Sequence, residues 1–194
     1  MKILVASGNE GKIKEIKEIL KKADIVTIND IKNAVTVIED GQTFEENAKK
    51  KAKELYLVSN IPCIADDSGI CIKEYDNWPG VKTARFLGEE KAGNEYARQR
   101  NEFILYKMQG LEKAKRKAEN ITVIAYYDGN QFQIGKGILS GYIATSCRGE
   151  NGFGFDEIFE LEDGRTLAEL KAGEKNNISS RKKALEEIKQ KIIK

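Results

Sequence analysis

The sequence predicts a single α/β domain built on a long mixed β-sheet with flanking helices. In the first part of the chain, short apolar runs alternate with segments whose apolar residues recur at helical spacing, a pattern typical of alternating strands and helices. Further along, two runs rich in β-branched and aromatic residues flank an Asp-Gly-Asn turn, which indicates a β-hairpin. No internal repeat, low-complexity tract or Pro- or Ser-rich linker interrupts the chain, so residues 1–194 are expected to form one domain.

The turn Ser7-Gly8-Asn9-Glu10-Gly11-Lys12 joins the first predicted strand, residues 3–6, to a helix predicted over residues 12–22. A glycine turn at a helix start presents N–H groups and the positive end of the helix dipole, so phosphate fits there. The turn is not a P-loop, because that motif needs four residues before its Gly-Lys pair and a Ser or Thr after it. It is therefore either a phosphate site or a glycine turn required by steric factors alone.

A second strand is expected over residues 24–28, and a long helix follows after a polar linker and the apolar residues 35–38. Thr43 and Glu46 have the spacing of a capping box, which marks the start of this helix. Lys51 is expected on the helix flank, where a solvated lysine is the ordinary outcome. The buried stripe is predicted to consist of Phe44, Ala48, Ala52, Leu55 and Tyr56.

Two adjacent carboxylates, Asp66 and Asp67, follow a short apolar strand predicted over residues 63–65. Successive side chains of a strand point to opposite faces, so the two carboxylates reach one site only if the strand breaks there. Gly69 permits such a break, and we expect a turn over residues 66–69 with one of the two aspartates used in chemistry. Extended structure is expected to resume over residues 70–72.

A helix is predicted over residues 94–109, and the charged segment that follows it is expected to be exposed. The hairpin strands are predicted over residues 121–127 and 131–134, and a further strand is expected over residues 137–139. Near residue 78 the Trp-Pro-Gly sequence indicates a turn.

The loop formed by residues 148–156 contains three glycines and two phenylalanines. Such a loop is either a ligand-contacting segment, because glycine admits close approach and the rings can stack, or a tight turn with core phenylalanines. Thr166 and Glu169 repeat the capping-box spacing, and Ser179 and Ser180 precede a final amphipathic helix.

The composition excludes several classes of function. Lys and Arg total 33 against 31 Asp and Glu, so no strong field attracts nucleic acid or a membrane. No histidine is present, which excludes histidine general bases, Ser-His triads and His-ligated metals and leaves carboxylates, lysines and a hard, oxygen-bound cation. No apolar run has signal-peptide or membrane length, and the three cysteines lack metal-ligand spacing, so a cytoplasmic protein with reduced thiols is expected. A solvated helix face explains the basic run Lys113, Lys115, Arg116 and Lys117.

The motifs together resemble the inosine triphosphate pyrophosphatase family over nearly the whole chain, from Ser7 to Arg181. The first turn matches the family's Thr-Gly-Asn-x-x-Lys motif with serine in place of threonine. Further matches are Glu39, Gly41, Thr43-Phe44, Glu46-Asn47-Ala48, Lys51-Ala52, Ala65-Asp66-Asp67-Ser68-Gly69, Pro79-Gly80, Gly152-Phe153-Gly154-Phe155-Asp156, Glu174-Lys175, Ile178-Ser179 and Arg181.

The resemblance implies a fold with two lobes around a central cleft and hydrolysis of ITP, dITP and XTP to the monophosphate and pyrophosphate. It implies Mg²⁺ held by Glu39 and Asp67, with Asp67 also accepting a proton, and a homodimer. Phosphates are assigned to Lys12, Lys51, Lys175 and the first turn, and the purine to a stacking Phe153 and to the edge-reading Asp156, Ser180 and Arg181. The full substrate-binding set is Ser7, Gly8, Asn9, Glu10, Gly11, Lys12, Lys51, Ser68, Phe153, Gly154, Phe155, Asp156, Lys175, Ser180 and Arg181.

The chain departs from the family pattern at two positions. Ser180 stands where the family usually has a histidine that lies at the base, and Glu157 stands where proline is common. The serine hydroxyl still donates and accepts hydrogen bonds. Two alternatives stay open: a pyrophosphatase for modified pyrimidine nucleotides, and a nucleotide-binding sensor without catalysis.

Overall fold

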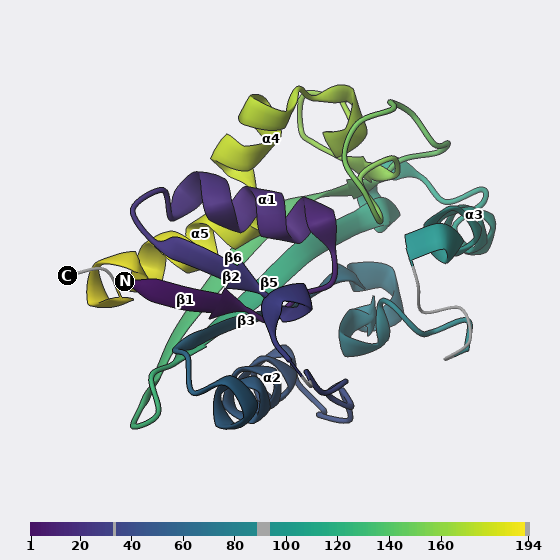
Figure 1. Ribbon diagram of the computed structural model, residues 1–194. Helices are drawn as coiled ribbons and strands as arrows, with labels where there is room; N and C mark the ends of the chain where they lie inside the picture. Colours follow the sequence, from purple (N-terminus) through teal and green to yellow (C-terminus); the bar gives the residue numbers. More distant parts are fainter. Residues whose placement is uncertain (33, 89–93, 193–194) are drawn as a thin grey trace. The chain divides into compact units, whose positions relative to one another are not determined.

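The computed structural model describes residues 1–32, 34–88 and 94–192, which form helices around a mixed sheet (Figure 1). Within the described residues the strand order is β2-β1-β3-β5-β6-β7, with β4 paired to β3. β1 is parallel to both β2 and β3, whereas β3–β4 and β6–β7 are antiparallel pairs. The elements are β1 (Lys2–Val5), α1 (Glu10–Ile19), β2 (Asp24–Thr27), α2 (Phe44–Ser59), β3 (Cys63–Ile72), β4 (Trp78–Pro79), α3 (Ala97–Lys107), β5 (Lys117–Tyr127), β6 (Phe132–Ile143), β7 (Phe159–Glu160), α4 (Ala172–Ile178) and α5 (Ser180–Ile192).

The chain divides into two compact units. Unit 1 comprises Met1–Ser68, Thr122–Gly137 and Ser180–Lys194, and unit 2 comprises Gly69–Ile121 and Ile138–Ser179. Three strands, β3, β5 and β6, contribute residues to both units. Neither unit is a contiguous stretch, so no linker in the sequence would mark their boundary.

In unit 1, the side chains of β1 alternate between two hydrophobic clusters. Ile3 and Val5 pack with residues of α1 and α5, whereas Leu4, and Ala6 just after the strand, pack with residues of α2. Figure 1 shows α1 and α5 on one side of these strands and α2 on the other. On β3, Ile64 belongs to the cluster of α1 and α5. The two-residue period of the strands therefore decides which helices each side chain meets.

The core of unit 2 forms around Ile70 and Ile72 of β3, Ile104 of α3, Met108 at the end of that helix, and Phe159 of β7. All five side chains are at most 2% exposed. This core confirms the helix predicted in the 94–109 segment, which begins as a 3₁₀ turn over Asn94–Tyr96 and continues as α3.

Several predicted elements are confirmed. Thr43 caps α2, and its side chain accepts from the N–H of Glu46 in a complete capping box. The hairpin turn lies between β5 and β6, which are neighbours in the sheet. The final helix begins at Ser180, and Ala184, Leu185, Ile188 and Ile192 are its main buried apolar residues.

The turn predicted over residues 66–69 is wrong, because β3 runs without a break from Cys63 to Ile72. The strand continues because each aspartate finds polar partners on its own face, as described below, so neither has to leave the sheet to be solvated. Asp67 is therefore a strand residue and not a turn former.

Other boundaries also differ from the prediction. α1 begins at Glu10, two residues earlier than expected, because Asn9 caps it. The strand expected over residues 137–139 is part of β6, and only a 3₁₀ turn, Leu167–Glu169, follows the second capping box. The 78–80 segment holds the short strand β4, with a cis Trp78-Pro79 bond.

The basic run at residues 113–117 is exposed at its three lysines, as the sequence predicts, but it does not form a helix face and Arg116 is buried. It begins with a 3₁₀ turn, Lys113–Arg116, and continues into β5. Arg116 is only 4% exposed, and its guanidinium donates to the backbone carbonyls of Ile143, Met108 and Ala144. The three backbone acceptors compensate for the loss of water around this charge. Arg116 therefore links three segments of unit 2 within its interior.

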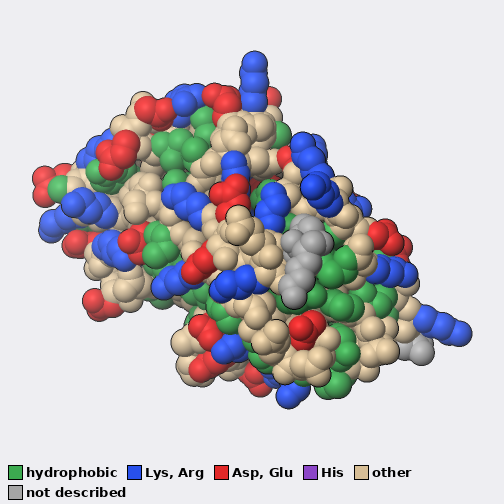
Figure 2. Space-filling view, turned by 90° about the vertical axis from the view of Figure 1, so that its left-hand side faces the viewer, with side chains coloured by type: hydrophobic (Ala, Val, Ile, Leu, Met, Phe, Trp, Pro, Cys, Tyr) green, Lys and Arg blue, Asp and Glu red, His purple; other side chains and the backbone are tan. Residues whose placement is uncertain are grey.

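The surface carries no dominant charge on the face that Figure 2 presents, where basic and acidic side chains are interspersed with small apolar patches. Within the described residues, no helix combines the length and the apolar character needed to cross a bilayer.

Candidate active site

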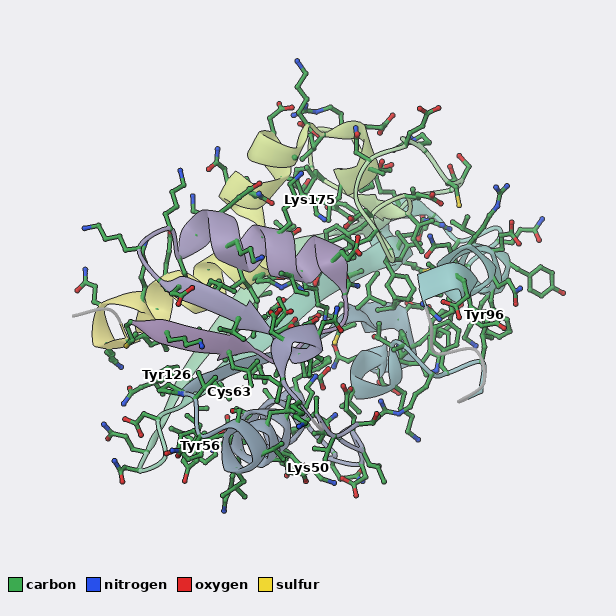
Figure 3. All side chains as sticks on the ribbon, viewed as in Figure 1. Lys50, Tyr56, Cys63, Tyr96, Tyr126 and Lys175 are labelled. Carbon is green, nitrogen blue, oxygen red and sulfur yellow. The ribbon has the colours of Figure 1, made fainter. Side chains whose placement is uncertain are left out.

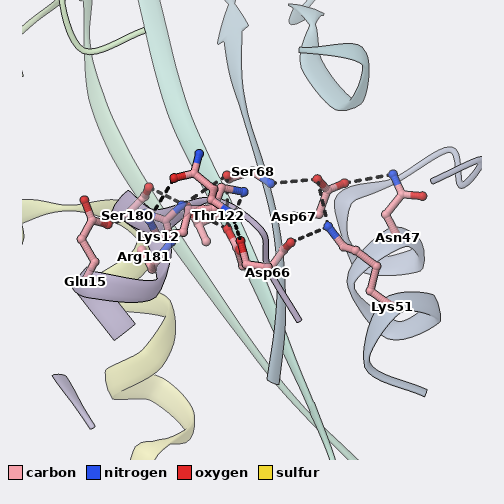
Figure 4. Close-up of polar contacts among 12 residues, drawn as sticks. Lys12, Glu15, Asn47, Lys51, Asp66, Asp67, Ser68, Thr122, Ser180 and Arg181 are labelled. Atoms are coloured by element: carbon pink, nitrogen blue, oxygen red, sulfur yellow. Dashed lines mark hydrogen bonds and ion pairs between the residues drawn. The ribbon is translucent and has the colours of Figure 1, made fainter. Parts of the chain in front are cut away.

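Asp66 and Asp67 lie next to each other on β3 and have separate partners, as strand alternation requires (Figure 4). Asp66 lies two residues after Ile64, so its side chain is on the same face of the strand and faces α1 and α5. Its Oδ2 lies 2.9 Å from Nζ of Lys12 and 3.0 Å from Nη2 of Arg181. One carboxylate oxygen thus binds a cation from the first helix and one from the last.

Arg181 has a second acidic partner in Glu15 of α1, to which its Nη1 donates. Glu15 is 4% exposed and Arg181 6% exposed, so the pair is removed from solvent. The sequence offers little sign of this role, because Glu15 lies in a helix rich in charged residues and its partner follows 166 residues later. Glu15 is therefore a buried member of the site that sequence reasoning missed.

The charges around Asp66 determine its ionisation. Burial alone would raise the pKa of this carboxyl, but Lys12 and Arg181 outweigh burial and hold the pKa well below its ordinary value. Asp66 is therefore an anion at neutral pH. Sequence reasoning left it out of the candidate residues because it expected only one of the two aspartates to be used.

The side chain of Asp67 lies on the opposite face of the strand and faces α2. Its Oδ2 accepts from Nδ2 of Asn47 at 2.9 Å, and its Oδ1 accepts from the backbone N–H of Ser68 at 3.0 Å. Nζ of Lys51 lies 3.8 Å from Oδ1. Burial raises the pKa of Asp67, Lys51 opposes this, and the neighbouring charge of Glu39 adds to the rise. The site thus holds two adjacent carboxylates whose pKa values move in opposite directions.

Lys51 is a buried residue and not the solvated flank lysine that the helix pattern predicts. Its Nζ donates to Oε1 of Glu39 at 2.9 Å and to the backbone carbonyl of Asp66 at 2.6 Å. Burial alone would lower the pKa of Lys51, but Asp67 and Glu39 raise it above the ordinary value. The side chain is therefore a fixed positive charge between two carboxylates.

The donor set beside Lys51 fits a hard divalent cation. Glu39 and Asp67 direct carboxylate oxygens at the same ammonium group, which shows that this position accepts positive charge. Within residues 1–32, 34–88 and 94–192, no group of three or more acidic, cysteine or histidine side chains could hold a metal ion. A cation bound by Glu39 and Asp67 would thus depend on other oxygens, as Mg²⁺ does when it binds one or two carboxylates plus phosphates and water.

The first turn forms the start of α1. Oδ1 of Asn9 accepts from the backbone N–H of Lys12 at 3.2 Å, and Oγ of Ser7 accepts from the N–H of Asn9 at 3.1 Å. A Cβ atom on Gly8 would meet nothing within 4 Å. Protein packing therefore does not explain this glycine, and the helix start is open to a ligand on that side. Glu10 and Gly11 form the first residues of the helix.

Ser180 begins α5 and is 4% exposed. Its hydroxyl lies 2.8 Å from the hydroxyl of Thr122 on β5, a residue that is 1% exposed. Ser68 lies near the same cluster, because its Oγ is 3.4 Å from both Oδ2 of Asp66 and Nη2 of Arg181. The hydroxyl of Ser68 thus lies beside the ion pairs of Arg181, whereas that of Ser180 pairs with Thr122.

Unit 2 contains a second group of the predicted residues. Oδ2 of Asp156 accepts from Nζ of Lys175 at 2.6 Å and from the backbone N–H of Phe153 at 2.7 Å. Nζ of Lys175, on α4 (Figure 3), also lies 4.1 Å from the centroid of the Phe153 ring, within cation–π range. Phe155 packs against the unit 2 core, whereas Phe153 does not belong to it. The tight-turn interpretation therefore applies to Phe155 alone.

Asn101 of α3 supports this loop and was missed by sequence reasoning. It is 1% exposed, and its Nδ2 donates to the carbonyl of Gly154 at 3.0 Å. Gly154 has a φ of +64°, a conformation that glycine adopts without strain. The loop that carries Phe153 is thus held by Asp156 on one side and by Asn101 on another.

Comparison with known sequences shows a match to the model of the Ham1 family over residues 3–191. A dITP/XTP pyrophosphatase of Elusimicrobium minutum is 40% identical over 201 residues, covering 99% of this chain and 100% of that protein. A dITP/XTP pyrophosphatase of Bacillus subtilis is 40% identical over 189 residues, covering 95% and 93%.

Solved structures of Ham1 proteins have the same fold as this chain. The Ham1 protein of Staphylococcus aureus superposes with a TM-score of 0.85 at 34% identity, covering 99% of this chain and 98% of that one. A HAM1 protein from Coxiella burnetii superposes with a TM-score of 0.87 at 32% identity and the same coverage. These matches confirm the predicted fold class, a mixed sheet flanked by helices.

Proposed function

The chain belongs to the Ham1 family, and from this membership we propose that it hydrolyses deaminated purine nucleoside triphosphates, ITP, dITP and XTP, to the monophosphate and pyrophosphate. The relatives that bear the name dITP/XTP pyrophosphatase match almost end to end. The structural observation that carries the proposal is the convergence of Glu39, Lys51 and Asp67, in which two carboxylates and a lysine meet beside β3.

In unit 1, the triphosphate is neutralised by Lys12 and Lys51 and by the first turn, from Ser7 to Gly11. Hydrolysis at the α-phosphorus needs the polyanion neutralised, a water molecule aligned and the pyrophosphate stabilised as it leaves. Lys51 is suited to this because it is buried and charged. Ser68 provides a further substrate contact.

Asp67 accepts the proton of the attacking water. A general base works best when its pKa lies near the working pH, and burial raises the pKa of Asp67 in that direction. Oδ2 of Asp67 accepts from Asn47 and Oδ1 accepts from the N–H of Ser68, and each oxygen keeps a second lone pair for the proton. The acceptor is thus held in one orientation before substrate binds.

Glu39 and Asp67 are the residues that would hold Mg²⁺. Bound there, the ion would neutralise phosphate charge and lower the pKa of a coordinated water molecule. Both carboxylates already face a positive charge, the ammonium of Lys51, at 2.9 and 3.8 Å.

In unit 2, Phe153 stacks on the purine and Lys175 contributes charge toward the phosphates, while Asp156 and the backbone of Gly154 and Phe155 contact the base. Arg181, in unit 1, donates to the 6-oxo oxygen that hypoxanthine and xanthine share. Ser180 supplies a hydroxyl where the family usually has a histidine. Guanine also carries the 6-oxo oxygen, so discrimination against GTP depends on leaving its 2-amino group without an acceptor.

The test is the identity of the first product. Purified protein with ITP and Mg²⁺ is expected to release IMP and pyrophosphate, so orthophosphate appears only after inorganic pyrophosphatase is added. Orthophosphate from the protein alone would refute the bond assignment. Asp67→Asn is expected to lose nearly all turnover while keeping its thermal unfolding midpoint, whereas the exposed Asp163→Asn variant serves as a control and keeps full activity.

A substrate panel decides between this proposal and its alternatives. Higher kcat/KM for dUTP or a methylated pyrimidine triphosphate than for ITP would favour the pyrimidine enzyme. Tight ITP binding without hydrolysis in Mg²⁺ would favour the sensor. Comparing native protein with Ser180→His over ITP, XTP, dITP, GTP and ATP measures what the serine contributes to base selection.

We also propose that the protein acts as a homodimer in the cytoplasm and that residues 1–194 form one functional domain. One family model matches residues 3–191 without interruption, which supports the single domain. Light scattering on the purified protein gives the oligomeric state directly.

A further inference from the structure

Asn47 is a fully buried amide beside the carboxylates assigned above to the metal, at 0% exposure. It lies in the first turn of α2, four residues after the capping Thr43. A buried asparagine is costly unless both ends of its amide are hydrogen-bonded. The identity of its two partners therefore indicates why an asparagine stands here.

The two partners belong to different segments of unit 1. Nδ2 donates to Oδ2 of Asp67 at 2.9 Å, a contact drawn in Figure 4, and Oδ1 accepts from the backbone N–H of Gly41 at 2.8 Å. A carboxylate can only accept from the amide and an N–H can only donate to it, so both partners require the same amide orientation. The side chain is thus locked from both ends.

Gly41 lies two residues after Glu39, in a loop that the first two turns of α2 hold in place. Its backbone approaches Asn47 so closely that a Cβ atom would lie 2.7 Å from Oδ1 and 2.8 Å from Cβ of Glu46. The N–H of Gln42 donates to Glu46 at 2.7 Å, which fastens the next residue of the loop. Because Gly41 packs against Asn47 and donates to it, the position of Asn47 fixes the position of the backbone two residues after Glu39.

We propose that Asn47 is a positioning residue that orients both metal-binding carboxylates at once: Asp67 through its donor end and the Glu39 loop through its acceptor end. The inference deepens the proposed function and rests on it. By occupying Oδ2 of Asp67, Asn47 leaves Oδ1 as the oxygen that faces Lys51. Residues that hydrogen-bond to metal ligands typically change metal affinity or activity by about 10- to 100-fold when they are removed.

Two variants separate the two ends of the amide. Asn47→Ala removes both hydrogen bonds. Asn47→Asp has nearly the same shape and keeps an oxygen for Gly41, but it places a second oxygen against Oδ2 of Asp67. Asn130→Asp, on the exposed hairpin turn, adds the same charge away from the site and is the matched control.

The primary readout is the affinity for Mg²⁺, measured by titration calorimetry on the full chain with an α,β-imido analogue of ITP, which resists cleavage. Asn47→Ala is expected to weaken Mg²⁺ binding about 10- to 100-fold. Asn47→Asp is expected to lower the thermal unfolding midpoint, because it buries a second carboxylate against Asp67, and to lower kcat at saturating Mg²⁺ at least about tenfold in the folded protein. The Asn130→Asp control is expected to match the native protein in all three measurements.

The inference is overturned if Asn47→Asp keeps native kcat and Mg²⁺ affinity, because the amide that faces Asp67 would then have no influence on the metal-binding carboxylates. It is also overturned if Asn47→Ala lowers only the unfolding midpoint. If Asn47→Ala does not fold, Asn47→Asp decides alone. If the native protein fails to cleave ITP, the proposed function fails, whereas the calorimetric comparison still measures what Asn47 does to metal binding.

Discussion

Replacing Asp66 with asparagine tests whether its buried carboxylate holds unit 1 together. Oδ2 of Asp66 is the shared acceptor for Lys12 at 2.9 Å and Arg181 at 3.0 Å. The side chain of Asp66 is 1% exposed and that of Arg181 7% exposed, whereas that of Lys12 is 20% exposed, so solvent compensates Lys12 in part but cannot compensate Arg181 for the lost negative charge. In Asp66→Asn, Arg181 keeps Glu15 as a carboxylate partner. Lys12 and Arg181 both then face a neutral amide in place of a carboxylate.

Removing one partner of a buried ion pair costs about 3–5 kcal/mol, because it leaves an uncompensated charge in the interior. For a chain of this length, each kcal/mol lowers the thermal midpoint by about 2–4 °C. The expected decrease is therefore about 6–20 °C. Urea unfolding followed by circular dichroism gives the free energy, and unchanged m-values would show that the two proteins unfold from comparable states.

Asp163→Asn is the matched control, because Asp163 also pairs with an arginine, Arg165 at 2.7 Å, but on the exposed surface. The control is expected to unfold at the native midpoint, since exposed ion pairs contribute little. A loss below about 1 kcal/mol in Asp66→Asn would refute the reasoning, because the two cations would then be satisfied without the carboxylate.

Two further predictions concern unit 2 and the thiols. Asn101→Ala frees the carbonyl of Gly154 and is expected to raise KM for ITP about tenfold with a smaller change in kcat, since it loosens the base-binding loop; equal KM values would exclude this role. Cys147 is exposed whereas Cys63 and Cys71 are buried, so a disulfide reagent is expected to modify one thiol in the native protein and three after unfolding. Burial raises the pKa of Cys63 to about 12, so this thiol is expected to stay protonated and unreactive at alkaline pH short of unfolding, and fast modification of Cys63 in the native protein would contradict this.

Sequence patterns predicted an element correctly where the signal lies within one short segment. The capping box of Thr43 and Glu46 marks the start of α2, and the Asp-Gly-Asn turn lies between β5 and β6 as expected. The break predicted after residue 65 failed for a different reason. Acidic residues favour a turn over a buried strand only if no cation neutralises them. The cations that neutralise Asp66 come from α1 and α5, at opposite ends of the chain, so the local sequence does not reveal them.

The site residues that sequence reasoning missed share one property: each acts through a contact with a distant segment. Glu15 resembles a surface glutamate until Arg181 is placed beside it, and Asn101 resembles a helix interior residue until the loop of Gly154 reaches it. Asn47 gave a faint signal, since asparagine is a poor helix former and stands in the first turn of a strong helix. Periodicity reports which face of an element is buried, but it does not report polar partners.

The register of β3 links the fold to the chemistry proposed for it. β3 pairs with β1 through Leu4 and Cys63 and through Val5 and Ile64, which fixes the face on which each later side chain emerges. A slip of one residue would move every side chain to the other face of the sheet. Asp67 would then meet the cations that now lower the pKa of Asp66, and it would lose the burial beside α2 that raises its own. Two chemically identical neighbours thus acquire pKa shifts of opposite sign from the pleat of one strand, so Asp66 stays an anion paired with Lys12 and Arg181 while Asp67 gains affinity for a proton.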